Sequence, residues 1–318
     1  MDSSTTDSGE VAAELAAGDL IDVLDQARRR FLALVADVRP DLHRYCARMT
    51  GSVAAGEDVV QDVLARAYYE LSQSKQLPPL RPWLFRIAHN RSIDYLRHEA
   101  YRVAESLDAA SDVADAPERE PDHILERRQA MHAALSCFLD LAPAQRACVI
   151  LKDVLDHSLE DIAEELSLSV PAVKAALHRG RAVLQRVSVA AAAAGPAPSR
   201  SSSPALRRYA ALFNARDWDG VRALLADDVR LDLVSQRKAA GRRDVGMYFS
   251  NYDSVHDWQL HPAWLDGREV LAVTHPDQGG APRYFIELGW TDDGLLASIR
   301  DFRYVPYIAR DGAIALAG

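Results

Sequence analysis

Residues 158–186 constrain the fold most, because they predict two short helices joined by a turn of about three residues. Ser158, with Asp161 three positions later, is a capping-box pattern that starts the first helix. Ser169 is a second N-cap, and Pro171 is tolerated in the turn of helix that follows. The second helix carries no acidic residue. This pattern predicts a helix-turn-helix, whose second helix enters the major groove of DNA.

The outer face of that second helix carries candidate DNA contacts. Lys174, His178 and Arg181 share one face, and Arg179 lies beside it. Cations at such positions meet phosphates and base edges. A helical hairpin without a role in DNA binding would show the same apolar stripe. However, a hairpin of that kind is less expected to have a helix without any carboxylate, because the chain as a whole is acidic, with a net charge of −9.

Composition excludes several classes of protein. A net charge of −9 argues against a chain that coats nucleic acid indiscriminately. Cys46, Cys137 and Cys148 have neither C-x-x-C nor zinc-site spacing, so we expect buried free thiols in a reducing cytoplasm and no metal or cofactor site. The start lacks a signal-peptide pattern, and the small-residue run at 190–194 is too short to span a membrane. No membrane partner is expected.

Shifts in composition divide the chain into segments. We expect a disordered acidic tail at 1–20, a helical domain at 21–102, an acidic linker at 103–122 and a second helical domain at 123–189. A Pro/Ser linker follows at 190–203. Short helices at 205–215 and 218–225, with strands at 229–234, 270–274, 284–290 and 295–304, then predict an α+β domain over 204–307 and a tail at 308–318. The fold class is therefore multidomain, with two all-α domains before an α+β domain.

The first helical domain carries an acidic face. Asp58, Gln61 and Asp62 lie together on one side of a predicted helix, and an acidic patch of this kind could dock on a basic partner helix. The alternative is a solvated face with no partner, which composition alone favours.

A second segment of that domain mixes aromatic rings with cations. Residues 81–102 hold four aromatic side chains together with Arg86, Asn90, Arg91 and Arg97. This mixture suits single-stranded DNA, where bases stack on rings and phosphates meet arginine. The alternative is a plain core stripe, which accounts for the apolar members of the segment but leaves its polar members unexplained.

These two segments and the run at 141–163, in this order, resemble the extracytoplasmic-function (ECF) sigma factors of bacterial RNA polymerase over about residues 27–188. The resemblance implies a domain that opens the minus-ten promoter element and a helix-turn-helix domain that reads the minus-thirty-five element. It implies core RNA polymerase and promoter DNA as partners, and no catalytic residue.

Residue roles follow from the resemblance by position. Asp58, Gln61 and Asp62 match the motif that docks on the coiled coil of the polymerase's largest subunit. Asn90 matches a position that helps to hold a flipped-out minus-ten base, whose extrusion costs a few kcal/mol. Together with the residue patterns above, we expect contacts from Arg86, Asn90, Arg91 and Arg97 to the minus-ten element, and from Lys174, His178, Arg179 and Arg181 to the minus-thirty-five element.

The segment 206–231 is similar to the start of SnoaL-like domains, cone-shaped α+β folds with one deep pocket, and the resemblance spans about residues 204–307. Such domains occur as cyclases and isomerases, and as C-terminal extensions of certain ECF sigma factors. Tyr248, Tyr252 and Trp290 are candidates for lining a pocket that binds a small molecule. No Asp/His pair stands at a diagnostic spacing, so catalysis is not expected. One group of ECF sigma factors with a SnoaL-like extension carries an Asp-Gly-Gly-Gly-Lys motif and an Asn-Pro-Asp-Lys-Leu motif. Both motifs are missing here, and the regulatory interface of that group therefore cannot be assigned to residues of this chain.

The sequence therefore predicts a cytoplasmic ECF sigma factor whose C-terminal domain contacts the helical domains and regulates them in cis. The alternative is a SnoaL-like enzyme tethered to DNA by a helical module. A ligand-responsive repressor is a third possibility, which leaves residues 83–97 unexplained. The promoter sequence, the inducing signal, the sign of the regulation and the existence of a separate anti-sigma factor are not predicted.

Overall fold

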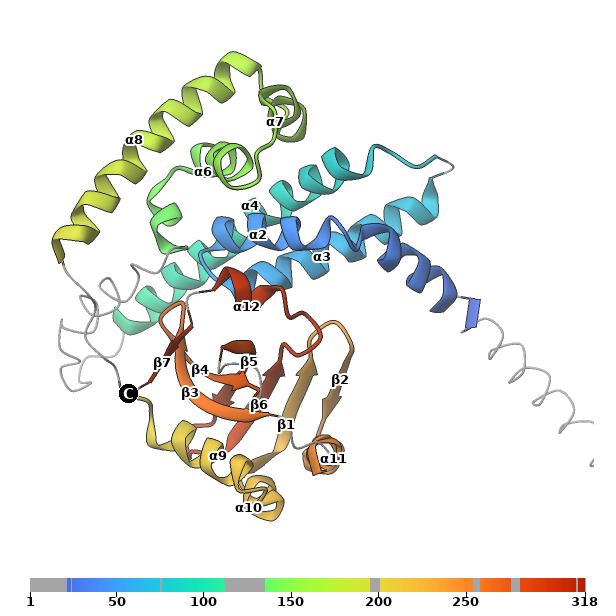
Figure 1. The fold of residues 1–318 in the computed structure, drawn as a ribbon, viewed down its shortest axis with the longest axis vertical. Coiled ribbons are helices and arrows are strands. Elements are labelled where there is room, and N and C mark those ends of the chain that lie inside the picture. The colour runs from blue at the N-terminus through green and yellow to red at the C-terminus, as the bar shows by residue number, and fades with distance from the viewer. Residues whose placement is uncertain are drawn as a thin grey trace, which may run out of the picture.

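The computed structural model describes residues 22–23, 25–74, 76–111, 135–194, 201–253, 258–275, 281–312 and 314–317. Three bodies follow one another along the long axis (Figure 1): residues 136–194 at one end, 25–111 in the middle and 204–316 at the other end. The predicted tail at 1–20, residues 112–122 of the acidic linker and 195–200 of the Pro/Ser linker lie outside the described residues.

The middle body is helical. A helical stretch at 25–35 precedes α2 (Arg39–Thr50), α3 (Val53–Gln73) and α4 (Leu80–Ser111). Helix α2 ends at Gly51, whose φ of 78° is the left-handed conformation that glycine adopts at low cost. A Cβ atom on Gly56 would lie 2.6 Å from the backbone of Ala47, so this glycine lets α2 and α3 pack closely.

The second helical body contains η1 (Ser136–Asp140), α6 (Pro143–Val149), the π-helical turn η2 (Ile150–Val154), α7 (Leu159–Leu166) and α8 (Val170–Ala194). The predicted capping box of Ser158 and Asp161 is present at the start of α7. Ser169 accepts a hydrogen bond from the amide of Ala172, as expected of an N-cap. The left-handed Ser167 (φ 55°) turns the chain between α7 and α8, which confirms the helix-turn-helix.

The C-terminal body is an α+β domain, as predicted. Its helices are α9 (Pro204–Asn214), α10 (Trp218–Ala223), α11 (Arg242–Asp253) and α12 (Ile308–Asp311). Its strands are β1 (Leu225–Leu233), β2 (Arg237–Ala240), β3 (Gln259–Leu265), β4 (Arg268–Thr274), β5 (Pro282–Trp290), β6 (Leu296–Asp301) and β7 (Ala315–Leu316). They form one sheet in the order β2-β1-β6-β5-β4-β3-β7, with β1 and β6 parallel and the other pairs antiparallel.

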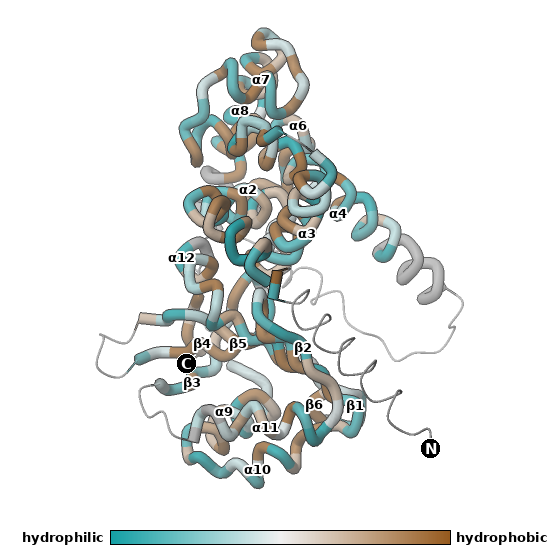
Figure 2. The backbone as a smooth tube through the Cα atoms, turned by 90° about the vertical axis from the view of Figure 1, so that its right-hand side faces the viewer, coloured by the Kyte–Doolittle hydropathy of each residue, from teal (hydrophilic) through white to brown (hydrophobic). Residues whose placement is uncertain are grey.

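The two faces of this sheet meet different layers. Alternate residues of a strand point to opposite faces: Leu271 and Val273 of β4 pack with the α9–α11 side, whereas Val270 and Ala272 pack with α12 and the first helical domain. Figure 2 shows α2, α3 and α12 lying between the sheet and the helix-turn-helix. The helical core and the sheet therefore meet across one boundary, which α2, α3 and α12 form.

Candidate nucleic-acid interface

The second helix of the helix-turn-helix presents its cations to solvent. Its inward residues Val173 and Leu177 are buried in the helical core. The four residues assigned to the minus-thirty-five element are all exposed on α8: Lys174, His178, Arg179 and Arg181. The structure thus brings these four side chains onto one outward surface, and their contact with DNA stays a prediction.

One of these cations already has an internal partner. The guanidinium of Arg181 donates to both carboxylate oxygens of Asp153, at 2.9 and 2.5 Å, and these hydrogen bonds raise the pKa of Arg181. A groove of about 340 Å³ between α7 and α8 is lined by Lys152, Lys174 and His178 together with Arg181. Cations gathered along a groove suit a phosphate backbone, and Arg181 would have to leave Asp153 to meet one.

The α4 residues assigned to the minus-ten element lie beside a buried stripe, in which Leu84 is 0% exposed. Asn90 is exposed, and Arg91 and Arg97 each lie 3.8 Å from the carboxylate of Asp94. Exposed pairs of this kind contribute only ~0–1 kcal/mol. Both guanidinium groups can therefore leave Asp94 for a phosphate at little cost.

The second helical domain packs on the start of this α4 surface. Arg86 lies 3.7 Å from Glu164 of α7. Next to it, the ring of Phe85 meets the ring of His157 edge to face, with centroids 4.9 Å apart. His157 in turn lies 3.0 Å from the buried carboxylate of Glu165, whose pKa burial raises. The second helical domain therefore lies against one end of the surface assigned to the minus-ten element, next to Arg86.

The C-terminal domain is paired with one residue assigned to polymerase docking, Asp58. Arg300 of β6 donates to Asp58 of α3 at 2.5 Å. The same guanidinium reaches Glu287 at 3.2 Å and Asp232 at 3.9 Å, so three carboxylates surround it. Asp62, on the same helix as Asp58, is exposed. One residue of the predicted docking set is thus paired across the domain boundary.

A second cross-domain network surrounds Glu57, which has no exposed surface. Its carboxylate accepts hydrogen bonds from Arg39 at 2.6 Å, from the hydroxyl of Tyr307 at 2.7 Å and from Gln61 at 3.2 Å. Arg39 also donates to Ser235 of the C-terminal domain at 2.8 Å. Burial and the nearby carboxylate raise the pKa of Tyr307, which keeps its hydroxyl a donor. A buried carboxylate is tolerated because these donors satisfy it.

The C-terminal domain also supplies part of a helix cap. Asp266, in the β3–β4 turn, accepts a hydrogen bond of 2.8 Å from the amide of Val53, the first residue of α3. Ser52 caps the same helix from within the helical domain, by accepting from Ala55. The first amides of a helix have no partner inside it, so a carboxylate at this end is stabilising.

The predicted pocket residues of the C-terminal domain lie in two places. The hydroxyls of Tyr248 and Tyr252 donate to the carboxylate of Asp301, at 2.7 and 2.8 Å, and all three side chains are buried. Burial, the largest effect, raises the pKa of Asp301. Trp290 pairs with Leu296 at the other end of the β5–β6 ladder, about 13 Å along the strand at ~3.3 Å per residue. The structure joins the two tyrosines and leaves Trp290 apart; a role in ligand binding stays a prediction.

Sequence reasoning missed the residues on the C-terminal side of the boundary, because Arg300, Tyr307 and Asp266 lie more than two hundred residues from their partners (|i−j| is 242, 250 and 213). One signal was present. Glu57 occupies the buried face of α3 four residues after Val53. A carboxylate at a core position requires partners.

Comparison with known families agrees with this architecture. The family model described as Sigma-70 region 2 matches residues 34–102, and the model described as Sigma-70, region 4 matches residues 131–184. The first range covers α2, α3 and α4 as far as residue 102, and the second covers α6, α7 and α8 as far as residue 184. The fold and the matched regions together define a protein with the two helical regions of a sigma-70 factor.

Curated relatives narrow this class. The chain is 33% identical over 218 residues to the ECF RNA polymerase sigma factor SigG of Mycobacterium tuberculosis, covering 61% of this chain and 59% of SigG. It is 31% identical over 139 residues to SigL of the same species, covering 43% of this chain and 76% of SigL. The chain belongs to the ECF RNA polymerase sigma factors. It spans about three fifths of the length of the SigG relatives.

Among solved structures, one that aligns with 30% of this chain is a protein from Kribbella flavida that was assigned provisionally as a ketosteroid isomerase. It is 28% identical, 73% of it is covered, and the TM-score is 0.24. Across the described ranges, every helix is too short or too polar to cross a lipid bilayer.

Proposed function

We propose that this chain is a transcription initiation factor that binds core RNA polymerase and promoter DNA, and that its C-terminal domain restrains it in cis. The observation that carries this proposal is the ion pair between Arg300 and Asp58, at 2.5 Å. Asp58 belongs to the set assigned to polymerase docking, and Arg300 already holds its carboxylate from β6, so a polymerase cation would have to displace Arg300 or share the carboxylate with it. In this arrangement the C-terminal domain competes with the polymerase.

Promoter binding requires the two helical domains to separate. Elements named minus-ten and minus-thirty-five lie about 25 base pairs apart, or ~85 Å at ~3.4 Å per base pair. In the structure the two helical domains share one hydrophobic core, and Glu164 of α7 lies 3.7 Å from Arg86 of α4. Such a compact arrangement supports an inactive state, because two domains packed on one core cannot reach two elements that lie this far apart.

The cross-domain contact has the composition of a reversible one. Among the residues that the structure describes, the first helical domain contributes Ala47, Val53 and Ala54 to the buried apolar cluster on that face of the sheet. Most of the other residues of the cluster come from the C-terminal domain itself, through residues such as Phe302 and Ile308. Polar pairs such as Arg300–Asp58 and Tyr307–Glu57 add further contacts, and interfaces of this kind within a chain allow relative domain motion.

The alternative is an enzyme tethered to DNA, and it needs an acid or base that substrate can reach. One candidate in the C-terminal domain is Asp301, which is 0% exposed and accepts hydrogen bonds from two buried tyrosines. This burial favours a structural role for the Tyr248–Tyr252–Asp301 cluster. We therefore propose no catalytic activity, and we place the chain in the cytoplasm, where core polymerase acts.

The test is promoter-dependent run-off transcription with bacterial core polymerase, using the full chain, two test variants and one control variant. Asn90→Ala and Asp58→Arg should each abolish the transcript, because one alters the minus-ten surface and the other the docking surface. Asp244→Arg, an exposed charge reversal on α11, is the matched control and should leave the transcript unchanged. Equal transcription by all four chains would contradict the assigned roles.

A further inference from the structure

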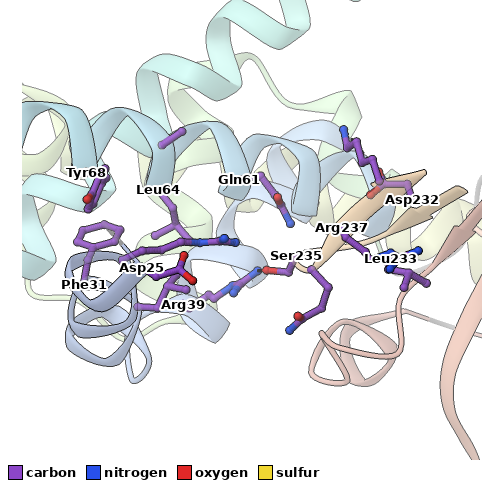
Figure 3. A pocket seen from close by; sticks show the side chains of 15 residues that line it. Asp25, Phe31, Arg39, Gln61, Leu64, Tyr68, Asp232, Leu233, Ser235 and Arg237 are labelled. Atoms are coloured by element: carbon purple, nitrogen blue, oxygen red, sulfur yellow. Dashed lines mark hydrogen bonds and ion pairs between the residues drawn. The ribbon is translucent and has the colours of Figure 1, made fainter. Parts of the chain in front are cut away.

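A pocket of about 560 Å³ opens where the helical domains and the C-terminal domain meet. One wall comes from the helical stretch at 25–35 and from α3, and the other from β1, β2 and the turn between them (Figure 3). Pockets of 300–1,000 Å³ are typical of small-molecule sites. Because each domain supplies only one wall, the pocket exists only while the two domains are in contact.

One end of this pocket is apolar. The rings of Phe31 and Tyr68 meet edge to face, with centroids 5.4 Å apart, and Leu32 and Leu64 lie beside them. Figure 3 shows Phe31 and Tyr68 together at one end, with Arg237 toward the other. Aromatic rings in this geometry offer a flat apolar surface to another ring system.

The rest of the lining is positively charged. Its charged members are the cations Arg28, Arg39, Arg237 and Lys238 and the acids Asp25 and Asp232. Arg39 is paired with Glu57 at 2.6 Å, and Lys238 lies 3.8 Å from Asp232. Within the described ranges of the chain, Arg28 and Arg237 take part in no ion pair. These two guanidinium groups come from opposite domains.

We propose that this pocket binds an organic anion with an aromatic ring system. The ring system packs against Phe31 and Tyr68, and the acidic group lies among the cations of the lining, of which Arg28 and Arg237 have no ion pair within the described ranges. Arginine suits this role because its planar donors pair with two oxygens of a carboxylate, sulfonate or phosphate at once. The ligand class is therefore an amphipathic aromatic acid, bound between the domains and outside the interior of the SnoaL-like cone.

Binding at this pocket has a consequence that rests on the proposed function. A ligand that binds only when the domains are in contact favours that state, because it multiplies the ratio of the contacting state to the separated state by 1 + [L]/Kd. At a concentration nine times its own Kd, the ligand raises the apparent Kd of the chain for core polymerase about tenfold. Gln61, which lines the pocket and belongs to the docking set, places the ligand beside the surface that polymerase would need.

The experiment uses 8-anilinonaphthalene-1-sulfonate, a fluorescent aromatic anion, titrated into the full chain. We expect saturable binding of one molecule per chain. The double variant Arg28→Glu with Arg237→Glu should weaken this binding at least tenfold. Gln236→Trp, which adds bulk at an exposed position of the pocket wall, should weaken it without changing the charge.

The matched control is Arg208→Glu with Arg243→Glu, which makes the same change in net charge at exposed positions of α9 and α11. Its affinity for the dye should stay within twofold of the wild type. Equal affinity in both double variants, or dye binding that never saturates, would overturn the proposal.

A second measurement separates this proposal from the proposed function. If dye binding depends on Arg28 and Arg237 but does not weaken polymerase binding, the pocket stands and the in-cis competition fails. If the double variant leaves dye binding unchanged while Arg300→Glu still strengthens polymerase binding, the pocket proposal fails. Competition between the C-terminal domain and polymerase is then still supported.

Discussion

Arg300 of β6 and Asp58 of α3 are 242 residues apart in the chain, yet they form a hydrogen-bonded ion pair of 2.5 Å. The pair joins the C-terminal sheet to the helix that carries the predicted polymerase-docking residues. With the networks around Glu57 and Asp266, it makes the first helical domain the centre of the closed arrangement, in contact with both other domains.

Asp153 is expected to weaken DNA binding by the helix-turn-helix, because it holds Arg181 in a bidentate ion pair. Asp153→Ala should raise the affinity for minus-thirty-five DNA about threefold and steepen the dependence of log K on log salt by ~1, the slope of one added phosphate contact. The measurement is fluorescence anisotropy on a labelled duplex at several salt concentrations. Glu160→Ala, at an exposed position of α7, is the control for the change in net charge; an equal gain there would exclude a specific role for Arg181.

Glu57 is expected to be essential for stability, because its buried carboxylate joins Arg39 and Tyr307 across the domain boundary. Glu57→Gln keeps the shape but leaves the largely buried Arg39 without its counter-charge, which costs about 3 kcal/mol. Urea unfolding, followed by circular dichroism and tryptophan fluorescence, should show a clear fall in the midpoint. Asp62→Asn, an exposed change on the same helix, should cost less than ~0.5 kcal/mol. Similar midpoints for the two variants would show that the network contributes little.

The cysteines should differ in their reactivity with pH. Burial raises the pKa of Cys46 to about 12 and that of Cys148 to about 11, whereas Cys137 is only half-buried. A raised thiol pKa means less thiolate at a given pH: about 1 in 10⁴ of Cys46 and 1 in 10³ of Cys148 at pH 8. Iodoacetamide should modify Cys137 first, as detected by mass spectrometry. As the pH rises, Cys148 should become labelled before Cys46. Fast labelling of Cys46 in the folded chain would contradict its burial.

The elements with local sequence signals were predictable. The side chains of Ser158 and Ser169 each cap an amide three residues further along the chain, and Asp161 caps back to Ser158. Because these hydrogen bonds are local, the capping pattern in the sequence marks where both helices of the helix-turn-helix begin. Strands β4 and β5 were found from apolar patterns that burial on both faces of the sheet explains. Strand β3 was missed because it contains Pro262, which lacks an amide donor and argues against a strand interior; it is tolerated beside the two-residue edge strand β7.

The contacts between domains could not be predicted from local patterns. Arg300 reads in the sequence as one of many arginines, and only the folded sheet brings it to Asp58. Tyr252 was expected to line a pocket, and the structure directs its hydroxyl to Asp301. Each of these outcomes depends on packing between segments that are far apart in the chain, for which the sequence carries no spacing signal.

The most direct test of the central claim is the affinity of the full chain for core polymerase, compared between the wild type and Arg300→Glu. The reversal places a carboxylate among Asp58, Asp232 and Glu287, so the closed state should lose at least ~1.4 kcal/mol and polymerase binding should strengthen about tenfold. Arg310→Glu, on α12, is the matched control and should bind like the wild type. Unchanged or weaker binding by Arg300→Glu would contradict competition between the C-terminal domain and the polymerase.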